Sequence, residues 1–343
     1  MDKLQDAGIF PYGSEQLSTY QKHLIRYLSR EFKRLEARQG AVAISNRGPM
    51  WGQTGELMEH HYDEDDRLFS TFLDQRHKAY SMAYYGDTAE EVKASPLSLE
   101  EAQTLKFKII SERAGIRGDE KILNIGCGFG SLESYLYSIY PKLEITSVTP
   151  STVQADYIKE KKSECAHPFH GKRFTLINDD FANIQPETLG LESFDLILSI
   201  GVLEHVNNLY TLFSRLYQLL KPGGKTFHHL ITSRIIIPNF LDSDNTLIGK
   251  YFPGGKVWPF ATLEAQHDFF QLEQSWFING MNYYRTLDQW HQRFWENIEQ
   301  LYPSVLSEEA IKHWNDYFVL CKACFAPEDG AVYGNGHFLY RKN

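Results

Sequence analysis

The stretch KILNIGCGFGSLESYLYSIYPKLEITSVTPSTVQ, residues 121–154, decides the fold of this chain. A short apolar run at 122–125 ends in a glycine-rich turn at 126–130, and a second apolar run follows at 144–148. Between them lies an amphipathic helical pattern, because apolar residues recur at spacings of four and three. These residues are Leu132, Leu136 and Ile139. The stretch therefore predicts a β-α-β unit.

The glycine-rich turn can serve either a ligand or only the path of the chain. Gly126, Gly128 and Gly130 let the backbone turn sharply, and they leave no Cβ between a ligand and the helix N-terminus. An ordinary tight turn between a strand and a helix shows the same GxGxG pattern. A nicotinamide-binding motif instead has GxGxxG and an acidic residue about 20 positions on. Residues 147–149 carry no acid, which disfavours that alternative.

Further blocks follow in a fixed order. Residues 194–200, FDLILSI, predict a third strand, and GVLEH follows at 201–205. A helix is expected at about 209–220, then KPGG at 221–224 and a strand at 225–231. This order resembles the class I S-adenosylmethionine-dependent methyltransferases. The resemblance implies an α/β fold with a Rossmann-like seven-stranded sheet and helices on both faces.

Other segments narrow the resemblance. Residues 149–154, TPSTVQ, look like the T-x-S-x-x-Q segment of the cyclopropane-fatty-acid-synthase superfamily, which includes the mycolic acid methyltransferases and the coclaurine-type N-methyltransferases. The similarity runs from about Trp51 to the C-terminus. The blocks that agree are HYD at 61–63, AYSMAYY at 79–85, LSLEEAQ at 97–103, YFPGG at 251–255 and YYRTLDQW at 283–290.

The resemblance also predicts how the chain is divided. Residues 1–56 would form an N-terminal helix with a lid or linker, and residues 57–343 a methyltransferase domain. That domain comprises a helical cap at 57–115, a cofactor-binding core at 116–232, and an acceptor-site insertion with the C-terminal part at 233–343. Within the cap, residues 99–114 predict a helix that leads into the core. Within the last part, residues 233–251 would roof the acceptor site, and two helices between 286 and 325 would complete the roof.

The resemblance implies S-adenosylmethionine as the cofactor. The peptide groups of the glycine turn would face its methionine and ribose, and the YS pair would reach the methionyl end. Asp180 would accept a hydrogen bond from the adenine amino group, with Phe181 against the ring. Asn124 stands where many methyltransferases carry an acid, and an amide supplies no charge. The predicted cofactor-binding residues are Tyr80, Ser81, Gly126, Gly128, Thr149, Gln154, Asp180 and Phe181.

Methyl transfer needs little chemistry from the protein, because the sulfonium carbon is already an electrophile. Catalysis is mainly in-line positioning and stabilisation of developing charge. An alkene acceptor forms a carbocation that must be shielded and then lose a proton to a base. An amine acceptor needs a base that frees its lone pair. The predicted catalytic residues are Glu204, His205, His229 and Tyr283, and the Glu-His pair can serve either route.

The two branches of the superfamily imply different bases. In the fatty-acid branch a bicarbonate ion is held by a Cys, a Glu, a His-x-Ile and a Tyr. The matching positions here are Met82, Glu204, His229, Ile231 and Tyr283. A thioether cannot donate a hydrogen bond, which weakens the case for bicarbonate and for cyclopropane formation. The amine branch uses the Glu-His pair directly, and residues 275–280 and 333–342 look closer to that branch.

From the sequence we favour an unsaturated fatty-acyl or lipid-like carbon acceptor over a hydrophobic small amine. A non-catalytic cofactor-binding protein is a third alternative, suggested by Asn124 and Met82. The expected partner is a small hydrophobic acceptor. A net charge of -9 argues against nucleic acid as a partner.

The composition also suggests a compartment. Four cysteines fit a reducing one, and neither a membrane-spanning run nor a signal peptide is visible, so a cytoplasmic protein is expected. Residues 15–38 predict a helix with Ser14 as N-cap, Gly40 as its stop, and Tyr20 and Phe32 on one apolar stripe. Its basic residues could touch an anionic membrane, but interspersed acids favour docking on its own domain.

Two remaining clusters contain residue types that can bind a metal ion. His60 and His61 precede acids at 63–66, but neighbouring residues do not converge on one helix face, and the family uses no metal here. Cys321 and Cys324 form a CxxC whose helical context favours a buried packing face. No metal site is predicted.

Overall fold

The computed structural model describes residues 4, 7–37, 48–51, 66–236 and 255–343. Several of the predictions lie outside these residues. They are the Gly40 helix stop, the HYD block at 61–63, the histidines at 60–61 and most of the predicted roof at 233–251.

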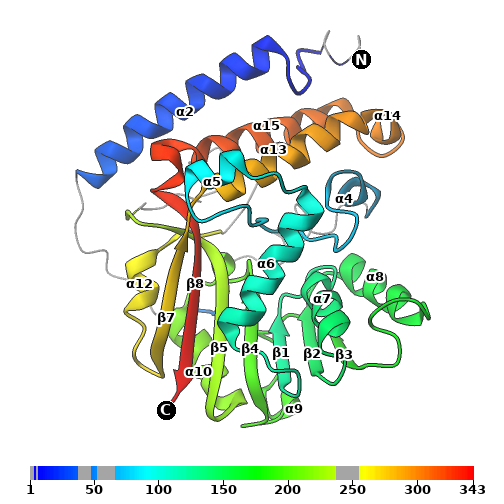
Figure 1. Cartoon of the computed structure of the whole chain (residues 1–343), viewed down its shortest axis with the longest axis vertical. Coiled ribbons are helices and arrows are strands. Elements are labelled where there is room, and N and C mark those ends of the chain that lie inside the picture. The colour runs from blue at the N-terminus through cyan, green and yellow to red at the C-terminus, as the bar shows by residue number, and fades with distance from the viewer. Residues whose placement is uncertain (1–3, 5–6, 38–47, 52–65, 237–254) are drawn as a thin grey trace.

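The described residues form one mixed sheet with the strand order β3-β2-β1-β4-β5-β8-β7 (Figure 1). Neighbours from β3 to β5 are parallel, and β8 runs antiparallel to both β5 and β7. The two-residue β6, Trp258–Pro259, pairs with β5 beside this path. The predicted seven-stranded Rossmann-like sheet is confirmed, with β6 as an addition. The strands are β1 Lys121–Ile125, β2 Glu144–Thr149, β3 Arg173–Asn178, β4 Phe194–Ile200, β5 Leu220–Ser233, β7 Phe270–Ile278 and β8 Tyr333–Lys342.

Apolar runs form the central strands because both faces of the sheet are covered. Successive side chains of a strand point to opposite faces, so Ile122 and Leu123 belong to different hydrophobic clusters. The cluster of Ile122 includes residues of α6, α7 and α8, whereas the cluster of Leu123 includes residues of α10. The helices are α6 Leu99–Ala114, α7 Ser131–Ile139, α8 Thr152–Ser163, α9 Pro186–Leu189 and α10 Leu209–Leu219.

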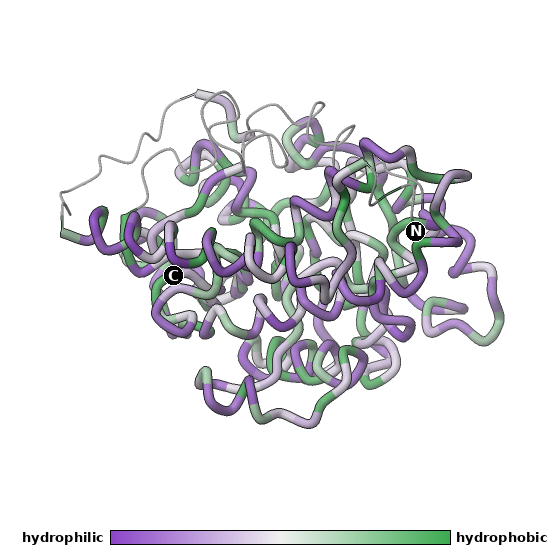
Figure 2. The backbone as a smooth tube through the Cα atoms, turned by 90° about the horizontal axis from the view of Figure 1, so that it is seen from above, coloured by the Kyte–Doolittle hydropathy of each residue, from purple (hydrophilic) through white to green (hydrophobic). Residues whose placement is uncertain are grey.

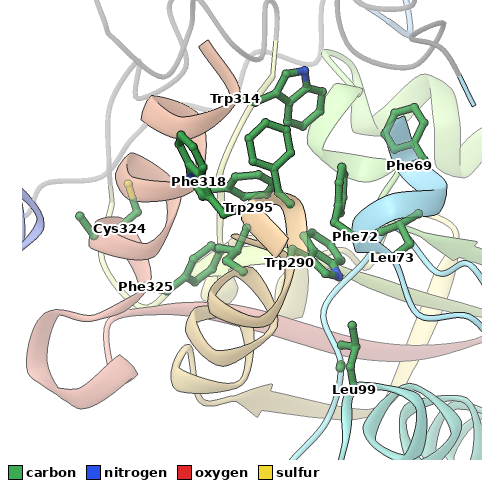
Figure 3. Close-up of a cluster of buried hydrophobic side chains, with 14 of the residues drawn as sticks. Phe69, Phe72, Leu73, Leu99, Trp290, Trp295, Trp314, Phe318, Cys324 and Phe325 are labelled. Carbon is green, nitrogen blue, oxygen red and sulfur yellow. The ribbon is translucent and has the colours of Figure 1, made fainter. Parts of the chain in front are cut away.

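A helical layer lies above the sheet in Figure 1, and an aromatic cluster joins its members. Phe72 packs against Trp290 and Phe318, with ring centroids 5.9 and 5.5 Å apart (Figure 3). These residues come from three helices, so the cluster binds α4, α13 and α15 together. Two helices between 286 and 325 were predicted, and both are present. The helices of this layer are α4 Asp66–Phe72, α5 Ala89–Ala94, α13 Met281–Glu296, α14 Ile298–Leu301 and α15 Glu308–Phe325.

The first long helix, α2 Glu15–Glu36, docks on α15 as predicted. The Ser14 hydroxyl accepts a hydrogen bond from the backbone of Leu17, so the predicted N-cap is confirmed. Phe32 is buried and stacks against Tyr333, with ring centroids 6.2 Å apart. Tyr20, expected on the same apolar stripe, is 44% exposed.

None of the helices among the described residues is long and apolar enough to cross a membrane. Figure 2 shows hydrophilic residues recurring along the backbone.

Two details differ from the sequence-based expectation. Ile139, the last residue of α7, is 53% exposed, whereas Leu132 and Leu136 are buried. The KPGG run at 221–224 lies inside β5 instead of preceding it. The pairing of β4 with β5 shifts register there, which accommodates the glycines.

Replacing Phe32 with alanine tests how α2 is held. The Phe32→Ala variant should lose about 3–5 kcal/mol of unfolding free energy, because it removes a fully buried ring. Tyr27→Ala, at a residue of the same helix that is 60% exposed, should change it by less than about 0.5 kcal/mol. Urea unfolding of both variants measures the difference, and equal losses would show that α2 is not held by this contact.

Candidate active site

The predicted site residues follow the carboxyl ends of the parallel strands. Gly126 comes directly after β1, Thr149 ends β2, and Asp180 lies two residues beyond β3. Glu204 lies in η2, Leu203–His205, shortly after β4. The carboxyl ends of parallel strands meet at one edge of the sheet, and ligands of open α/β sheets bind there. The fold therefore gathers these residues from across the chain.

The two glycines named as cofactor contacts have different surroundings. Both have positive φ, +72° at Gly126 and +57° at Gly128, which glycine adopts without strain. A Cβ on Gly126 would lie 2.4 Å from Val202 Cγ2, so the chain itself needs this glycine. A Cβ on Gly128 would meet nothing within 4 Å. The open space beside Gly128, at the N-terminal end of α7, fits a cofactor against the backbone.

Thr149 and Gln154, both predicted as cofactor-binding residues, lie together. Thr149 Oγ1 donates to Gln154 Oε1 at 2.8 Å, and both side chains are buried. The backbone N–H of Gln154 is in turn held by Ser151 Oγ, which caps α8. This bond uses the amide oxygen of Gln154 and leaves its NH2 group to face a different acceptor.

Asp180 lies at the predicted adenine end, but its closest partner is a residue that sequence analysis did not select. Trp51 Nε1 donates to Asp180 Oδ1 at 2.6 Å, and the backbone N–H of Ala182 donates to the same oxygen at 2.8 Å. Phe181 is buried in the core, with the Arg215 guanidinium 4.7 Å from its ring centre. Trp51 was noted only as the start of the family resemblance.

The acid that is missing at Asn124 is present elsewhere in space. Asn124 Nδ2 donates to Glu133 Oε1 at 2.7 Å, and Ser147 Oγ donates to the same oxygen. All three side chains are buried, and burial raises the pKa of Glu133. The carboxyl group therefore comes from the first turn of α7 and not from the end of β1. Sequence analysis missed Glu133 because it lies nine residues away, on a helix.

Tyr80 and Ser81 lie between α6 and the aromatic cluster. Lys106 Nζ donates to Ser81 Oγ at 2.8 Å, and Gln103 Nε2 donates to the Ser81 carbonyl at 2.9 Å. Burial lowers the pKa of Lys106 to about 7. The Tyr80 ring packs against Trp290, with ring centroids 5.3 Å apart. Ser81 is thus held by two side chains of α6, and sequence analysis had selected neither of them.

Glu204 has the properties of a buried base. Its Oε1 accepts a hydrogen bond of 2.7 Å from the backbone N–H of Ile231, whereas its Oε2 has no hydrogen-bond partner among the described residues. The residue is 4% exposed, and burial raises the pKa of Glu204 to about 7. Burial lowers the pKa of His205 to about 3, so this imidazole is neutral at pH 7.

His229 and Tyr283 have different neighbours. His229, in β5, is buried and contacts His337 of the adjacent β8, with 2.7 Å between Nδ1 and Nε2. The Tyr283 ring lies 4.5 Å from that of Phe325. The charges of Glu204 and Tyr283 both contribute to the raised pKa of Tyr333, so the three residues are neighbours, although burial is the main cause. His337 and Tyr333 were not predicted as site residues.

Met82, which replaces the cysteine of the fatty-acid branch, is fully buried. It belongs to a small apolar cluster with Tyr84 and Ile278, and Tyr283 packs against this cluster. The methionine therefore provides apolar packing beside Tyr283, where a cysteine would provide a weak donor.

The two thiols of the CxxC lie in α15 and belong to, or pack against, the hydrophobic cluster of the helical layer. Cys324 is buried and Cys321 is partly buried, and burial raises the pKa of both thiols. Over the part of the chain that the structure describes, no group of three or more His, Cys, Asp or Glu residues could hold a metal ion.

Comparison with known proteins defines the class and then the family. The strand order and the glycine turn are those of a class I S-adenosylmethionine-dependent methyltransferase. The profile of the mycolic acid cyclopropane synthetase family matches residues 52–333. Since this match covers most of the chain, the protein belongs to that family.

Curated relatives come from both branches. Cyclopropane-fatty-acyl-phospholipid synthase of Escherichia coli K12 is 30% identical over 275 residues, which cover 78% of this chain and 64% of that enzyme. The chain thus matches just under two thirds of the length of that relative. (S)-tetrahydroprotoberberine N-methyltransferase of Eschscholzia californica is 28% identical, and the match covers 68% of each chain.

Solved structures show the same fold. Coclaurine N-methyltransferase, bound to N-methylheliamine and SAH, superposes with a TM-score of 0.82 over 99% of both chains at 19% identity. The cyclopropane synthase MmaA2 from Mycobacterium tuberculosis gives a TM-score of 0.69 over 86% of this chain and 100% of its own, at 24% identity.

Alanine at Gly128 should separate cofactor binding from folding. A Cβ at this position would occupy the open space and should weaken binding of S-adenosylhomocysteine about tenfold or more, since one overpacked carbon costs ~1–3 kcal/mol. Gly126→Ala, whose Cβ meets Val202, should lower the thermal midpoint more than Gly128→Ala. Calorimetric titration and thermal unfolding of both variants give the two readouts. Unchanged affinity in Gly128→Ala would place the cofactor elsewhere.

The raised pKa of Glu204 predicts a pH-dependent stability. The folded protein keeps a proton on Glu204 up to about pH 7, whereas the unfolded chain releases it near 4.5. This contribution to stability is complete at low pH and is lost as the pH rises between these values. Glu204→Gln cannot ionise, so its thermal midpoint should fall less between pH 5 and 8 than that of the unsubstituted protein. Glu90→Gln, which changes an exposed carboxyl group, is the control. Identical pH profiles for all three proteins would contradict the raised pKa of Glu204.

Proposed function

We propose that this protein transfers a methyl group from S-adenosylmethionine to the nitrogen of a hydrophobic small amine, with Glu204 as the base. The observation that carries the proposal is the state of the Glu204 carboxyl group. One oxygen is held by the backbone of Ile231, and the other has no hydrogen-bond partner among the described residues. A pKa raised to about 7 suits a group that gains and loses a proton near neutral pH.

The proton balance follows from this geometry. An amine arrives mainly as its ammonium form, and the Glu204 carboxylate takes one proton so that the nitrogen lone pair becomes free. S-adenosylmethionine, when bound, would supply an electrophilic methyl carbon, with S-adenosylhomocysteine as the leaving group. A carboxylate beside the product also stabilises the positive charge that develops on nitrogen. His205 is neutral at pH 7, because its pKa is lowered to about 3.

The surroundings of Glu204 favour direct use of this carboxylate over a bicarbonate ion. The backbone N–H of Ile231, one of the donors that the fatty-acid branch implies for the anion, is already bonded to Glu204. Met82 is buried and offers no donor at the cysteine position. A bicarbonate ion would therefore lack two of its expected ligands, whereas an amine needs only the carboxylate.

In this proposal the acceptor lies between the cofactor edge of the sheet and the helical layer. The core at 116–232 would hold the cofactor, and Tyr80 and Tyr283 would offer aromatic faces toward an apolar acceptor. The fully buried Trp290 packs against both tyrosines, with its ring centroid 5.3 Å from that of Tyr80 and 6.3 Å from that of Tyr283. Aromatic faces also attract an ammonium or a methylated cationic product.

Methylation of a carbon in an unsaturated acyl chain is the second candidate. The observation that favours it is the 30% identity with a cyclopropane-fatty-acyl-phospholipid synthase. The aromatic faces that attract an ammonium would equally shield a carbocation. Proton removal would then fall to Glu204 or to a bound anion.

A transfer assay with labelled S-adenosylmethionine separates the two candidates. The protein is offered unsaturated phospholipids in vesicles and a panel of hydrophobic secondary and tertiary amines, each with and without added bicarbonate. We expect label in amines, independent of bicarbonate, and a loss of roughly 10²–10⁴-fold in kcat for Glu204→Gln. Label only in lipid would overturn the choice of acceptor.

Cofactor affinity provides the control for this assay. Glu204→Gln should bind S-adenosylhomocysteine as the unsubstituted protein does, because Glu204 is assigned to the proton and not to the cofactor. If Glu204→Gln loses affinity for S-adenosylhomocysteine, Glu204 contributes to cofactor binding. Full turnover in Glu204→Gln would show that Glu204 is not the base.

A further inference from the structure

Four side chains form a continuous chain of contacts beside Glu204, and three of them are buried. Arg113 Nη1 lies 2.9 Å from His337 Nδ1, and His337 Nε2 lies 2.7 Å from His229 Nδ1. His229 Nε2 lies 3.2 Å from the side-chain amide of Asn335. His229, His337 and Asn335 are each no more than 2% exposed, so water cannot replace these partners.

The arginine determines which ring nitrogens carry protons. A guanidinium can only donate, so His337 Nδ1 must accept and the proton of neutral His337 lies on Nε2. That N–H then donates to His229 Nδ1, which leaves the proton of neutral His229 on Nε2. Burial lowers the pKa of His229 to about 3, helped by the positive charges of Lys106 and Arg113, so a second proton is excluded at neutral pH.

The end of the chain agrees with this direction once the side-chain amide of Asn335 is turned. Asn335 Nδ2 faces His229 Nε2, whereas Asn335 Oδ1 has no partner among the described residues. Two donors cannot bond each other, and reversing the whole chain would only move the conflict to Arg113. The oxygen and nitrogen of an amide have nearly the same shape, and a half-turn of the Asn335 amide presents Oδ1 to the His229 N–H.

We propose that His337 is a positioning residue that holds His229 as a neutral Nε2–H donor, so that Glu204 alone serves as the base. This inference rests on the proposed function, since it distributes the roles within the same site. Both nitrogens of His229 are engaged, one accepting and one donating, and no lone pair remains for a proton from the acceptor. The sequence predicts His229 as a catalytic residue. In this proposal it is instead a neutral hydrogen-bond donor that takes no proton from the acceptor.

The histidine pair also acts on the position of Glu204. His229 and His337 are directly paired residues of β5 and β8. The carbonyl of His229 accepts a hydrogen bond of 2.8 Å from Gly201, at the start of the turn that carries Glu204. Two residues further along β5, the N–H of Ile231 holds the Glu204 carboxylate. His337 thus fixes the segment of β5 to which both ends of that turn are bonded.

The positive charges around the histidine pair come from α6. Arg113 and Lys106, both from α6, face the two rings and oppose their protonation. Tyr84 and Asp87 act on Arg113, and Asp74 acts on Lys106. Trp276 of β7 covers the guanidinium at 4.8 Å. None of the residues in this set supplies an anion in contact with either ring.

The tautomers can be read directly in the full-length protein by long-range ¹H–¹⁵N correlation spectra of ¹⁵N-histidine-labelled samples. The signals are assigned with His229→Gln and His337→Gln. We expect His229 to show a protonated Nε2 and a bare Nδ1, with no titration between pH 5 and 9. This readout needs no acceptor and no turnover. A protonated Nδ1 on His229, or titration near neutral pH, would overturn the proposal even if amine methylation is established.

Substitutions of His337 test its influence on the reaction. In His337→Leu the His229 signal should average between tautomers, and kcat should fall about tenfold, the equivalent of one buried hydrogen bond. Affinity for S-adenosylhomocysteine should not change. His337→Gln, whose amide can still donate to His229 Nδ1, should retain the Nε2–H tautomer and most of the rate.

His228 offers the matched control. It is the next residue of β5, equally buried, and points to the opposite face, where it pairs with Ser199 and Thr226. His228→Leu should leave the His229 tautomer unchanged at a comparable loss of stability. If His337→Leu and His228→Leu change the His229 signal equally, His337 acts only through packing. If neither leucine variant folds, the spectrum of the unsubstituted protein and that of His337→Gln still decide the question.

Discussion

Strand β5 is hydrogen-bonded along both edges, to β4 on one side and to β8 on the other. This double pairing holds the strand in place, and the site depends on it. The backbone of Ile231 holds the Glu204 carboxylate, and the carbonyl of His229 holds the turn that begins at Gly201. A loop alone would not keep a buried carboxylate in one place, because its backbone groups would be free to bond water instead.

Burial shifts the pKa values of the site residues and so determines their protonation states. Moving a charged group out of water disfavours the charged form, so the pKa of Glu204 rises whereas the pKa values of Lys106 and His229 fall. The fold keeps these groups inside because each has at least one well-placed partner. The polar groups near the cofactor turn follow the same rule, since Asn124 and Ser147 both donate to the buried carboxyl group of Glu133. Polar groups without such partners would destabilise the core.

Much of the fold could be predicted from local patterns. The bounds expected for β4 and α6 are those observed, and α10 differs from its expected end by one residue. These elements have apolar residues at a clear period and, in α6, a capping box of Ser98 and Glu101. Predictions failed where tertiary contacts decide whether a side chain is buried. Ile139 and Tyr20 have the right spacing for the apolar faces of their helices, but Ile139 is 53% exposed and Tyr20 is 44% exposed.

The sequence by itself determined the class of fold, the glycine turn and the family, because these depend on residues that are close together along the chain. The tertiary structure alone decided which polar groups meet. Trp51 and Asp180 are 129 residues apart in sequence, and His229 and His337 are 108 apart, yet each pair is in hydrogen-bond contact. Periodicity places a residue on a face of its own element, but partners on other strands are chosen by sheet order and register. The roles of Glu133, Trp51 and His337 could therefore not be predicted from spacing.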